Sequence, residues 1–233
     1  MIIIYVGGIG SGKTISAMKE LATRPYKAYT NFKTFNINKP LERLKWSQIY
    51  NKIPKEHYKD GRVKKWDYTM NYEYWRKQIK QEPFDIFIDE MQEMMHSRRG
   101  QSHQSICGTK WVSQIRKILG YDEENHLYVI TQRPRSIDIH CRELAQYWIY
   151  CDKITLPIPM KTKMFNGKTK ILPTHIIRQY LFDANQFDYE NVTLERIQRS
   201  TSRAISKSGF IANPLIQFYD SYQLVDFGNE EFV

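Results

Sequence analysis

The sequence predicts an α/β protein with a mainly parallel, wound sheet flanked by helices, and three segments carry this prediction. Residues 2–6, 84–88 and 126–131 are short apolar runs of the kind that form buried parallel strands. Each run stops at glycines or polar side chains, and helix-like segments follow the first two. Alternation of strands and helices in this way is typical of a wound sheet.

The first run leads into a phosphate-binding loop. Residues 7–14 read GGIGSGKT, which has the spacing G-x-x-x-x-G-K-[ST] of a P-loop. Glycines let backbone N–H groups converge on phosphate oxygens, and the next helix adds its positive end. Lys13 would contact the β- and γ-phosphates of ATP, while the Thr14 hydroxyl would bind Mg²⁺. The sequence therefore predicts a P-loop NTPase that binds ATP through Gly7, Gly8, Ile9, Gly10, Ser11, Gly12, Lys13, Thr14 and Ile15.

The second run ends in an acidic pair, Asp89 and Glu90. Ligands of open α/β sheets bind at the carboxyl ends of the strands. We expect Asp89 to help hold Mg²⁺ and Glu90 to polarise the water that attacks the γ-phosphate. The alternative is that both acids only cap the helix that follows. An acid next to the magnesium aspartate favours an ATPase over a kinase, because a kinase must exclude water.

The third run ends in Thr131 and Gln132. We expect this strand to lie between the other two, with Gln132 as a sensor of the γ-phosphate or the water; the alternative is a glutamine that starts an ordinary loop. Residues 145–151 predict another core strand.

Residues 108–121 predict a helix, and its buried face would carry Trp111, Val112, Ile115, Ile118 and Leu119. Arg116 lies off that face and is a candidate for an arginine finger, a catalytic arginine that ring ATPases take from a neighbouring subunit. The other candidates are Arg98, Arg99, Arg133 and Arg135, and each is otherwise a solvated surface arginine.

Composition predicts one large domain, because 233 residues that are 41% hydrophobic can bury a sizeable core. We divide it into an ATPase core at 1–153, with an insertion at 46–83, and a basic β-hairpin and C-terminal extension at 154–233 that pack on the same domain. Three cysteines without metal or disulfide spacing predict free thiols in a reducing compartment. His96, His103 and Cys107 fit no zinc pattern.

The net charge of +10 favours nucleic acid as a partner, and three segments concentrate basic residues. In the insertion, aromatic residues alternate with lysines and would either stack bases or pack on the core. Residues 154–183 predict a hairpin with an Asn166-Gly167 turn, whose lysines would grip DNA or block strand pairing. The hairpin lysines are Lys161, Lys163, Lys168 and Lys170, and a third basic stripe, if helical, is Arg196, Arg199, Arg203 and Lys207.

These motifs resemble those of the Zot-like (zonular occludens toxin) proteins of filamentous phages, which belong with the FtsK–HerA class of P-loop ATPases. The resemblance is carried by GGIGSGKT, FIDEMQEMMHSRR, IRKILG and LYVITQRPRSID, and by the tail QFYDSYQLV. In these proteins an Asp-Glu-x-Gln stretch matches Asp89, Glu90 and Gln92. A His-Arg-His element matches only at Arg116, because Ile115 and Lys117 replace the histidines.

The resemblance implies a homo-oligomeric, ring-shaped ATPase that packages or translocates viral DNA into a capsid, with DNA and capsid or other virion protein as partners. The filamentous-phage relatives continue into a membrane span, whereas no run in these residues approaches the ~18 apolar residues of a span. We therefore expect a chain in the host cytoplasm or associated with the virion. The alternatives are a phage morphogenesis or extrusion ATPase that acts with a membrane partner, a nucleotide-gated binding module, and a small-molecule kinase.

Overall fold

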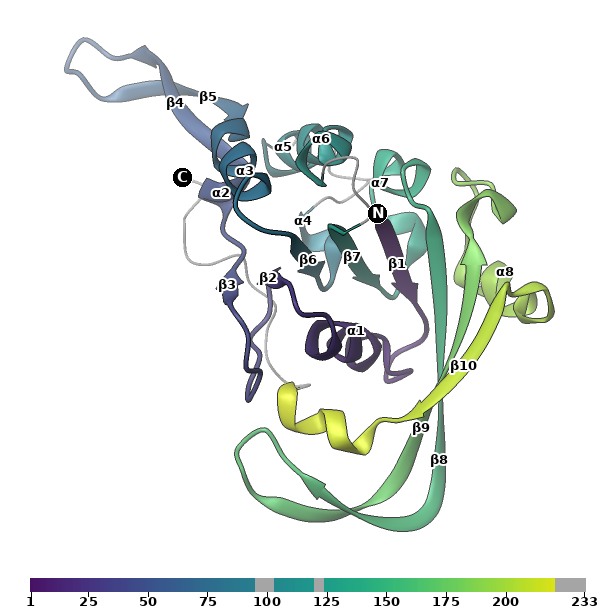
Figure 1. Ribbon diagram of the computed structural model, residues 1–233. Helices are drawn as coiled ribbons and strands as arrows, with labels where there is room; N and C mark the ends of the chain where they lie inside the picture. The colour runs from purple at the N-terminus through teal and green to yellow at the C-terminus, as the bar shows by residue number, and fades with distance from the viewer. Residues whose placement is uncertain (95–102, 120–123, 221–233) are drawn as a thin grey trace.

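The computed structural model describes residues 1–94, 103–119 and 124–220, which form a central sheet with helices on both faces (Figure 1). In these residues the main sheet has 8 strands in the order β10-β9-β8-β1-β7-β6-β2-β3. Neighbours from β8 to β3 run parallel, and β9 and β10 continue the sheet antiparallel. The strands are β1 (Ile2–Val6), β2 (Lys27–Thr30), β3 (Leu41–Arg43), β6 (Phe84–Ile88), β7 (His126–Thr131), β8 (Tyr147–Lys163), β9 (Thr169–Asp183) and β10 (Ser206–Ile211).

The mainly parallel wound sheet is confirmed, and β1, β6 and β7 have the bounds that the sequence predicts. β7 pairs in parallel with β1 on one side and with β6 on the other. The end of β7 therefore lies between the P-loop and the acidic pair, as predicted for the strand that carries Gln132.

Side chains alternate between the two faces of the sheet, as the period of two in a strand requires. On one face Ile4 packs in a cluster with Trp111 and Ile118. On the other face Tyr5 packs in a cluster with Met18. The helices over the first face include α3 (Tyr72–Ile79), α5 (His103–Ser113), α6 (Ile115–Leu119) and α7 (Ile139–Glu143), and those over the second are α1 (Lys13–Thr23) and the 3-10 helix η4 (Asn213–Phe218).

Two predicted helices are corrected. Residues 108–121 do not form one helix, because α5 ends at Ser113 and α6 begins at Ile115. Trp111, Val112, Ile118 and Leu119 are buried as predicted, and the side chain of Ile115 lies outside the description.

The predicted basic stripe is also wrong. Arg196 and Arg199 lie in α8 (Leu194–Arg199), which Thr193 caps by accepting a hydrogen bond from the Arg196 N–H. Arg203 ends the 3-10 helix η3 (Thr201–Arg203), and Lys207 lies in β10. The change from helix to strand removes the three- and four-residue spacing that a common face needs.

The predicted strand at 145–151 is the first part of the much longer β8, which with β9 forms a hairpin that curves beneath α1 (Figure 1). Asn166 and Gly167 lie in its turn, but not as a two-residue turn. Met164 N–H donates to the Lys168 carbonyl over 2.8 Å, so three residues lie between the paired positions. Gly167 has a φ of 79° and closes this longer turn without strain. The predicted division at 153/154 falls inside β8.

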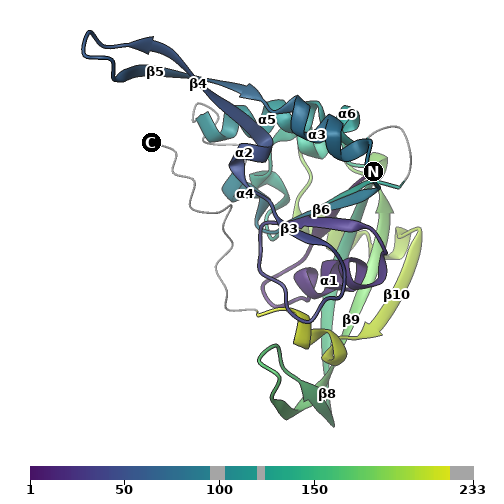
Figure 2. The ribbon, with the colours of Figure 1, turned by 60° about the vertical axis from the view of Figure 1, so that its left-hand side comes forward.

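The insertion consists of α2 (Trp46–Ile49), β4 (Tyr50–His57), β5 (Val63–Met70) and α3. β4 and β5 form a separate two-stranded arm that projects from the body (Figure 2). Many of its aromatic residues pack on the core as the bland interpretation predicts, since Trp46, Tyr50, Tyr68 and Trp75 are buried. Tyr58 is 54% exposed near the tip of the arm. The remaining short helices are α4 (Met91–Met94) and the 3-10 turns η1 (Pro134–Ser136) and η2 (Ala184–Gln186).

The three cysteines are buried and free, as the sequence predicts. Among the described residues, none of the helices has both the length and the apolar character that a membrane crossing requires.

One buried ion pair lies at the opposite end of β6 from the acidic pair. Asp85 is fully buried, and its carboxylate accepts a hydrogen bond from Arg24 Nε over 2.8 Å and another from the His126 N–H over 3.2 Å. Burial raises the pKa of Asp85, and Arg24 acts against this. The pair joins the end of α1 to the middle of the sheet.

We predict that Arg24→Met destabilises the protein by about 3 kcal/mol, because it leaves the Asp85 carboxyl buried without its cation. The matched control is Arg62→Met on the arm, where the pair with Asp60 is exposed and worth at most about 1 kcal/mol. Urea unfolding of both variants tests this. Equal losses in the two variants would contradict it.

Candidate active site

The P-loop connects β1 to α1, and its glycines are required by their surroundings. Gly10 and Gly12 have φ values of 71° and 89°, which favour glycine. A Cβ on Gly12 would lie 2.2 Å from Ile177 Cδ1, and a Cβ on Gly7 would lie 2.5 Å from the Cys151 carbonyl oxygen. Because Cys151 lies in β8 and Ile177 in β9, both strands pack directly against the loop.

The loop fits a phosphate chain in two respects. Its glycine backbone leaves room for oxygens to approach, and Gly8, Ile9 and Gly10 are exposed to solvent. The Ser11 hydroxyl is buried and makes no hydrogen bond with the described residues. A buried polar atom of this kind normally has a partner, and a phosphate oxygen can supply it.

Lys13 lies buried in the same loop, where Nζ donates a hydrogen bond to the Gly8 carbonyl oxygen over 2.9 Å. Burial lowers the pKa of Lys13, and the charges of Asp89 and Glu90 act in the opposite direction. An anionic phosphate next to Nζ would favour the charged form further.

Thr14 and Asp89 meet at the carboxyl edge of the sheet, as the predicted Mg²⁺ site requires. Thr14 Oγ1 donates to Asp89 Oδ2 over 2.9 Å. Burial raises the pKa of Asp89 to about 6, and the Thr14 hydrogen bond opposes this rise. Two hard oxygen ligands fit Mg²⁺, which usually takes few protein ligands and completes its shell with phosphates and water. In the described part of the chain, no group of three or more His, Cys, Asp or Glu residues forms a separate metal site.

Asn31 is a site residue that sequence reasoning missed. It follows β2 and is fully buried. Its Oδ1 accepts from the Asp89 N–H, and its Nδ2 donates to the Asp89 carbonyl oxygen, each over 2.8 Å. This clamp fixes the backbone where β6 turns into the acidic pair. A polar residue at the end of a short strand was the available signal, but only the β2–β6 pairing shows what it contacts.

Glu90 has a φ of 49°, in the left-handed region that non-glycine residues rarely adopt. Its N–H donates to Asp89 Oδ1 over 2.9 Å, which holds the turn. Gln132 Nε2 donates to Glu90 Oε1 over 2.9 Å, and Gln92 Nε2 donates to Glu90 Oε2. The structure therefore brings the predicted sensor Gln132 into direct contact with the predicted base.

The predicted arginine fingers do not join this cluster. Arg116 has its backbone in α6, but its side chain lies outside the described residues, as do Arg98 and Arg99 altogether. Arg133 is exposed, and Arg135 Nη2 donates to Asn191 Oδ1 over 2.9 Å. The identity of a finger stays a prediction.

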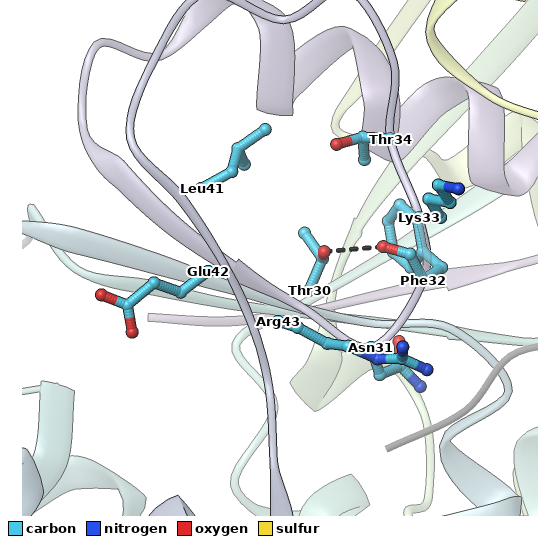
Figure 3. Close-up of a pocket in the computed structure, with 8 residues that line it drawn as sticks. All are labelled: Thr30, Asn31, Phe32, Lys33, Thr34, Leu41, Glu42 and Arg43. Atoms are coloured by element: carbon cyan, nitrogen blue, oxygen red, sulfur yellow. Dashed lines mark hydrogen bonds between the residues drawn. The ribbon is translucent and has the colours of Figure 1, made fainter. Parts of the chain in front are cut away.

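A cavity of about 430 Å³ lies beside the acidic pair, at the ends of β2 and β3 (Figure 3). Residues 30–34 and 41–43 line it, and these include Asn31 but no residue of the P-loop. Figure 3 shows the Thr30 hydroxyl donating to the Phe32 carbonyl oxygen, which tightens the turn that carries Asn31. The cavity is therefore a neighbour of the nucleotide site and distinct from it.

Comparison with known proteins finds similarity at the level of structure. No family model and no curated protein matches the sequence. The chain is similar to the N-terminal domain of zonular occludens toxin from Neisseria meningitidis, with 17% identity, a TM-score of 0.49, and coverage of 94% of this chain and 98% of that one. The domain is of the family that the sequence motifs resemble.

The chain is also similar to the genome packaging NTPase B204 from Sulfolobus turreted icosahedral virus 2. The complex of that protein with ATP-gammaS gives 13% identity, a TM-score of 0.37, and coverage of 79% of this chain and 93% of that one. Its AMPPCP complex gives 14% identity and a TM-score of 0.39 over the same shares. At these values the fold assignment rests on the strand order and the site geometry of the chain itself.

We predict that Asn31→Ala destabilises the protein by about 2 kcal/mol or more, because it leaves the buried N–H and C=O of Asp89 without partners. Asn36→Ala is the matched control, since that asparagine lies on the surface and donates only to the Gln217 carbonyl oxygen. Urea unfolding measures both variants. A loss for Asn31→Ala no larger than for Asn36→Ala would show that the clamp is not needed.

Proposed function

We propose that this protein is an ATPase that couples hydrolysis to the packaging or translocation of viral DNA. One observation carries the enzymatic part: the P-loop, the Thr14–Asp89 pair and a Glu90 carboxylate in contact with Gln132 all lie at the carboxyl edge of β1, β6 and β7. This edge is where wound sheets bind their ligands.

The roles follow from the chemistry of each group. Lys13 and the amides of the P-loop would hold the β- and γ-phosphates. Thr14 and Asp89 would hold Mg²⁺, which supplies positive charge next to the phosphates. Glu90 would orient the water whose oxygen attacks the γ-phosphorus, and take up its proton as the bond to the β-phosphate breaks. The products are ADP and inorganic phosphate, and Gln132 connects Glu90 to the end of β7.

Glu90 favours turnover over the two other nucleotide functions. A nucleotide-gated binding module needs a P-loop but no carboxylate aimed at water, and a kinase must keep water away from the γ-phosphate.

The proposal that DNA is the cargo rests on charge and on one connection within the fold. On the outer side of the β8–β9 hairpin, Lys161 lies opposite Ile171 and Lys163 lies opposite Thr169, and all four are exposed. On the inner side, Thr162 is buried and its Oγ1 accepts from Asn213 Nδ2 over 2.9 Å. The hairpin is thus anchored with its lysines outward. The same two strands pack on the P-loop through Cys151 and Ile177.

The remaining expectations belong to this proposal. They are a homo-oligomeric ring, contact with capsid or other virion protein, and action in the host cytoplasm or on the virion. A morphogenesis or extrusion ATPase driven by a membrane partner is the alternative that DNA-independent turnover would favour.

We predict ATP hydrolysis that single- or double-stranded DNA stimulates and that Lys13→Ala and Glu90→Gln each lower by about 100-fold or more. Lys13→Ala should also weaken nucleotide binding, whereas Glu90→Gln should keep it. Phosphate release and nucleotide titration measure these effects. Robust turnover that no DNA changes would sink the DNA coupling while leaving the ATPase in place.

We predict that Lys161→Glu/Lys163→Glu weakens DNA binding and reduces the dependence of affinity on salt, because two phosphate contacts are lost. Lys55→Glu/Lys59→Glu on the β4–β5 arm is the matched control, with the same change in charge at another exposed site. DNA binding by fluorescence anisotropy at several salt concentrations separates them. A loss confined to the arm variant would assign the contact to the arm instead.

A further inference from the structure

Glu90 is held from two sides by side-chain amides. Gln132 Nε2 donates to one carboxylate oxygen and Gln92 Nε2 to the other. Gln132 follows β7, whereas Gln92 lies in α4, directly after Glu90 in the chain. The reaction outlined above gives Gln92 no role.

The Gln92 amide is itself oriented by the sheet. Thr131 Oγ1 donates to Gln92 Oε1 over 3.0 Å, which leaves the Nε2 end to face Glu90. Thr131 is fully buried, and its hydroxyl also accepts from the Arg133 N–H over 3.1 Å. Both amides are therefore tied to the end of β7, Gln132 by the chain and Gln92 through Thr131.

This arrangement limits what the Glu90 side chain can do. A free glutamate side chain has rotamer freedom worth up to about 2 kcal/mol, and a base that must meet one water cannot use it. Each carboxylate oxygen has two acceptor sites, so one N–H donor on each leaves a site free for water. The amides can thus orient the carboxylate without blocking it.

We propose that Gln92 is a positioning residue, which acts with Gln132 to aim the Glu90 carboxylate at the attacking water. This inference rests on the proposed ATPase function. It assigns to α4 a task beyond continuing the chain, and to the Thr131 hydroxyl the task of setting which end of the Gln92 amide meets Glu90.

The test is Gln92→Met, which keeps the length of the side chain and removes both hydrogen bonds. We expect kcat for ATP hydrolysis to fall on the order of 10- to 100-fold, with the KM and the affinity for ATP changed by about twofold at most. Thr131→Val, which disconnects the far end of the amide, should lower kcat in the same direction. Gln198→Met, at an exposed position of α8, is the control for introducing a methionine and should leave kcat unchanged.

The decisive comparison repeats Gln92→Met in a Glu90→Gln background, with single-turnover hydrolysis as the readout. A residue that works through Glu90 should have no further effect there, whereas a residue needed only for folding should lower activity and melting temperature in both backgrounds.

Three results would bear against the inference. If Gln92→Met has the kcat of the wild type, or if its effect persists fully after Glu90→Gln, the positioning role is overturned while the ATPase function stands. A wild-type protein without hydrolysis that Lys13→Ala abolishes would overturn both.

Discussion

The position of β7 between β1 and β6 is the constraint on which the candidate site depends. Backbone pairing of β7 with both neighbours fixes the ends of three strands next to one another. Thr131 and Gln132 consequently lie between Lys13 on one side and Glu90 on the other. If β6 paired directly with β1, no residue of β7 would reach the carboxylate, and the acidic turn would lose its contact with the sheet.

The turn at Glu90 is costly and is held by many small interactions. A non-glycine residue at a positive φ costs on the order of 1–3 kcal/mol unless its surroundings fix it. Here Asn31 clamps Asp89, the Glu90 N–H bonds the Asp89 carboxylate, and Gln92 and Gln132 hold the side chain. Strained backbone of this kind is concentrated at functional sites, because only there does the gain in geometry justify it.

The parts of this arrangement that could be predicted are those encoded locally. Three apolar runs gave strands with the right bounds, and the P-loop spacing placed Lys13 and Thr14 correctly. Asn31 and Ile177 could not be found, because their partners lie far away in the chain and only sheet pairing brings them together. Asn166-Gly167 indicated a turn but not its length, which the register of β8 and β9 sets. The arginine spacing from 196 to 207 suggested a helix that the pairing of β10 with β9 replaces.

The close packing of Ile177 on Gly12 makes the P-loop and the β8–β9 hairpin parts of one mechanical unit, since neither surface can shift without displacing the other. Any ligand that binds the outer face of the hairpin and moves β9 must therefore change the affinity of the loop for nucleotide. Thermodynamic linkage makes this reciprocal, so the nucleotide must change the affinity for that ligand by the same factor. A cycle of tight and loose grip on a cargo can thus arise within one subunit, and neighbouring subunits need only set the order in which the cycles occur.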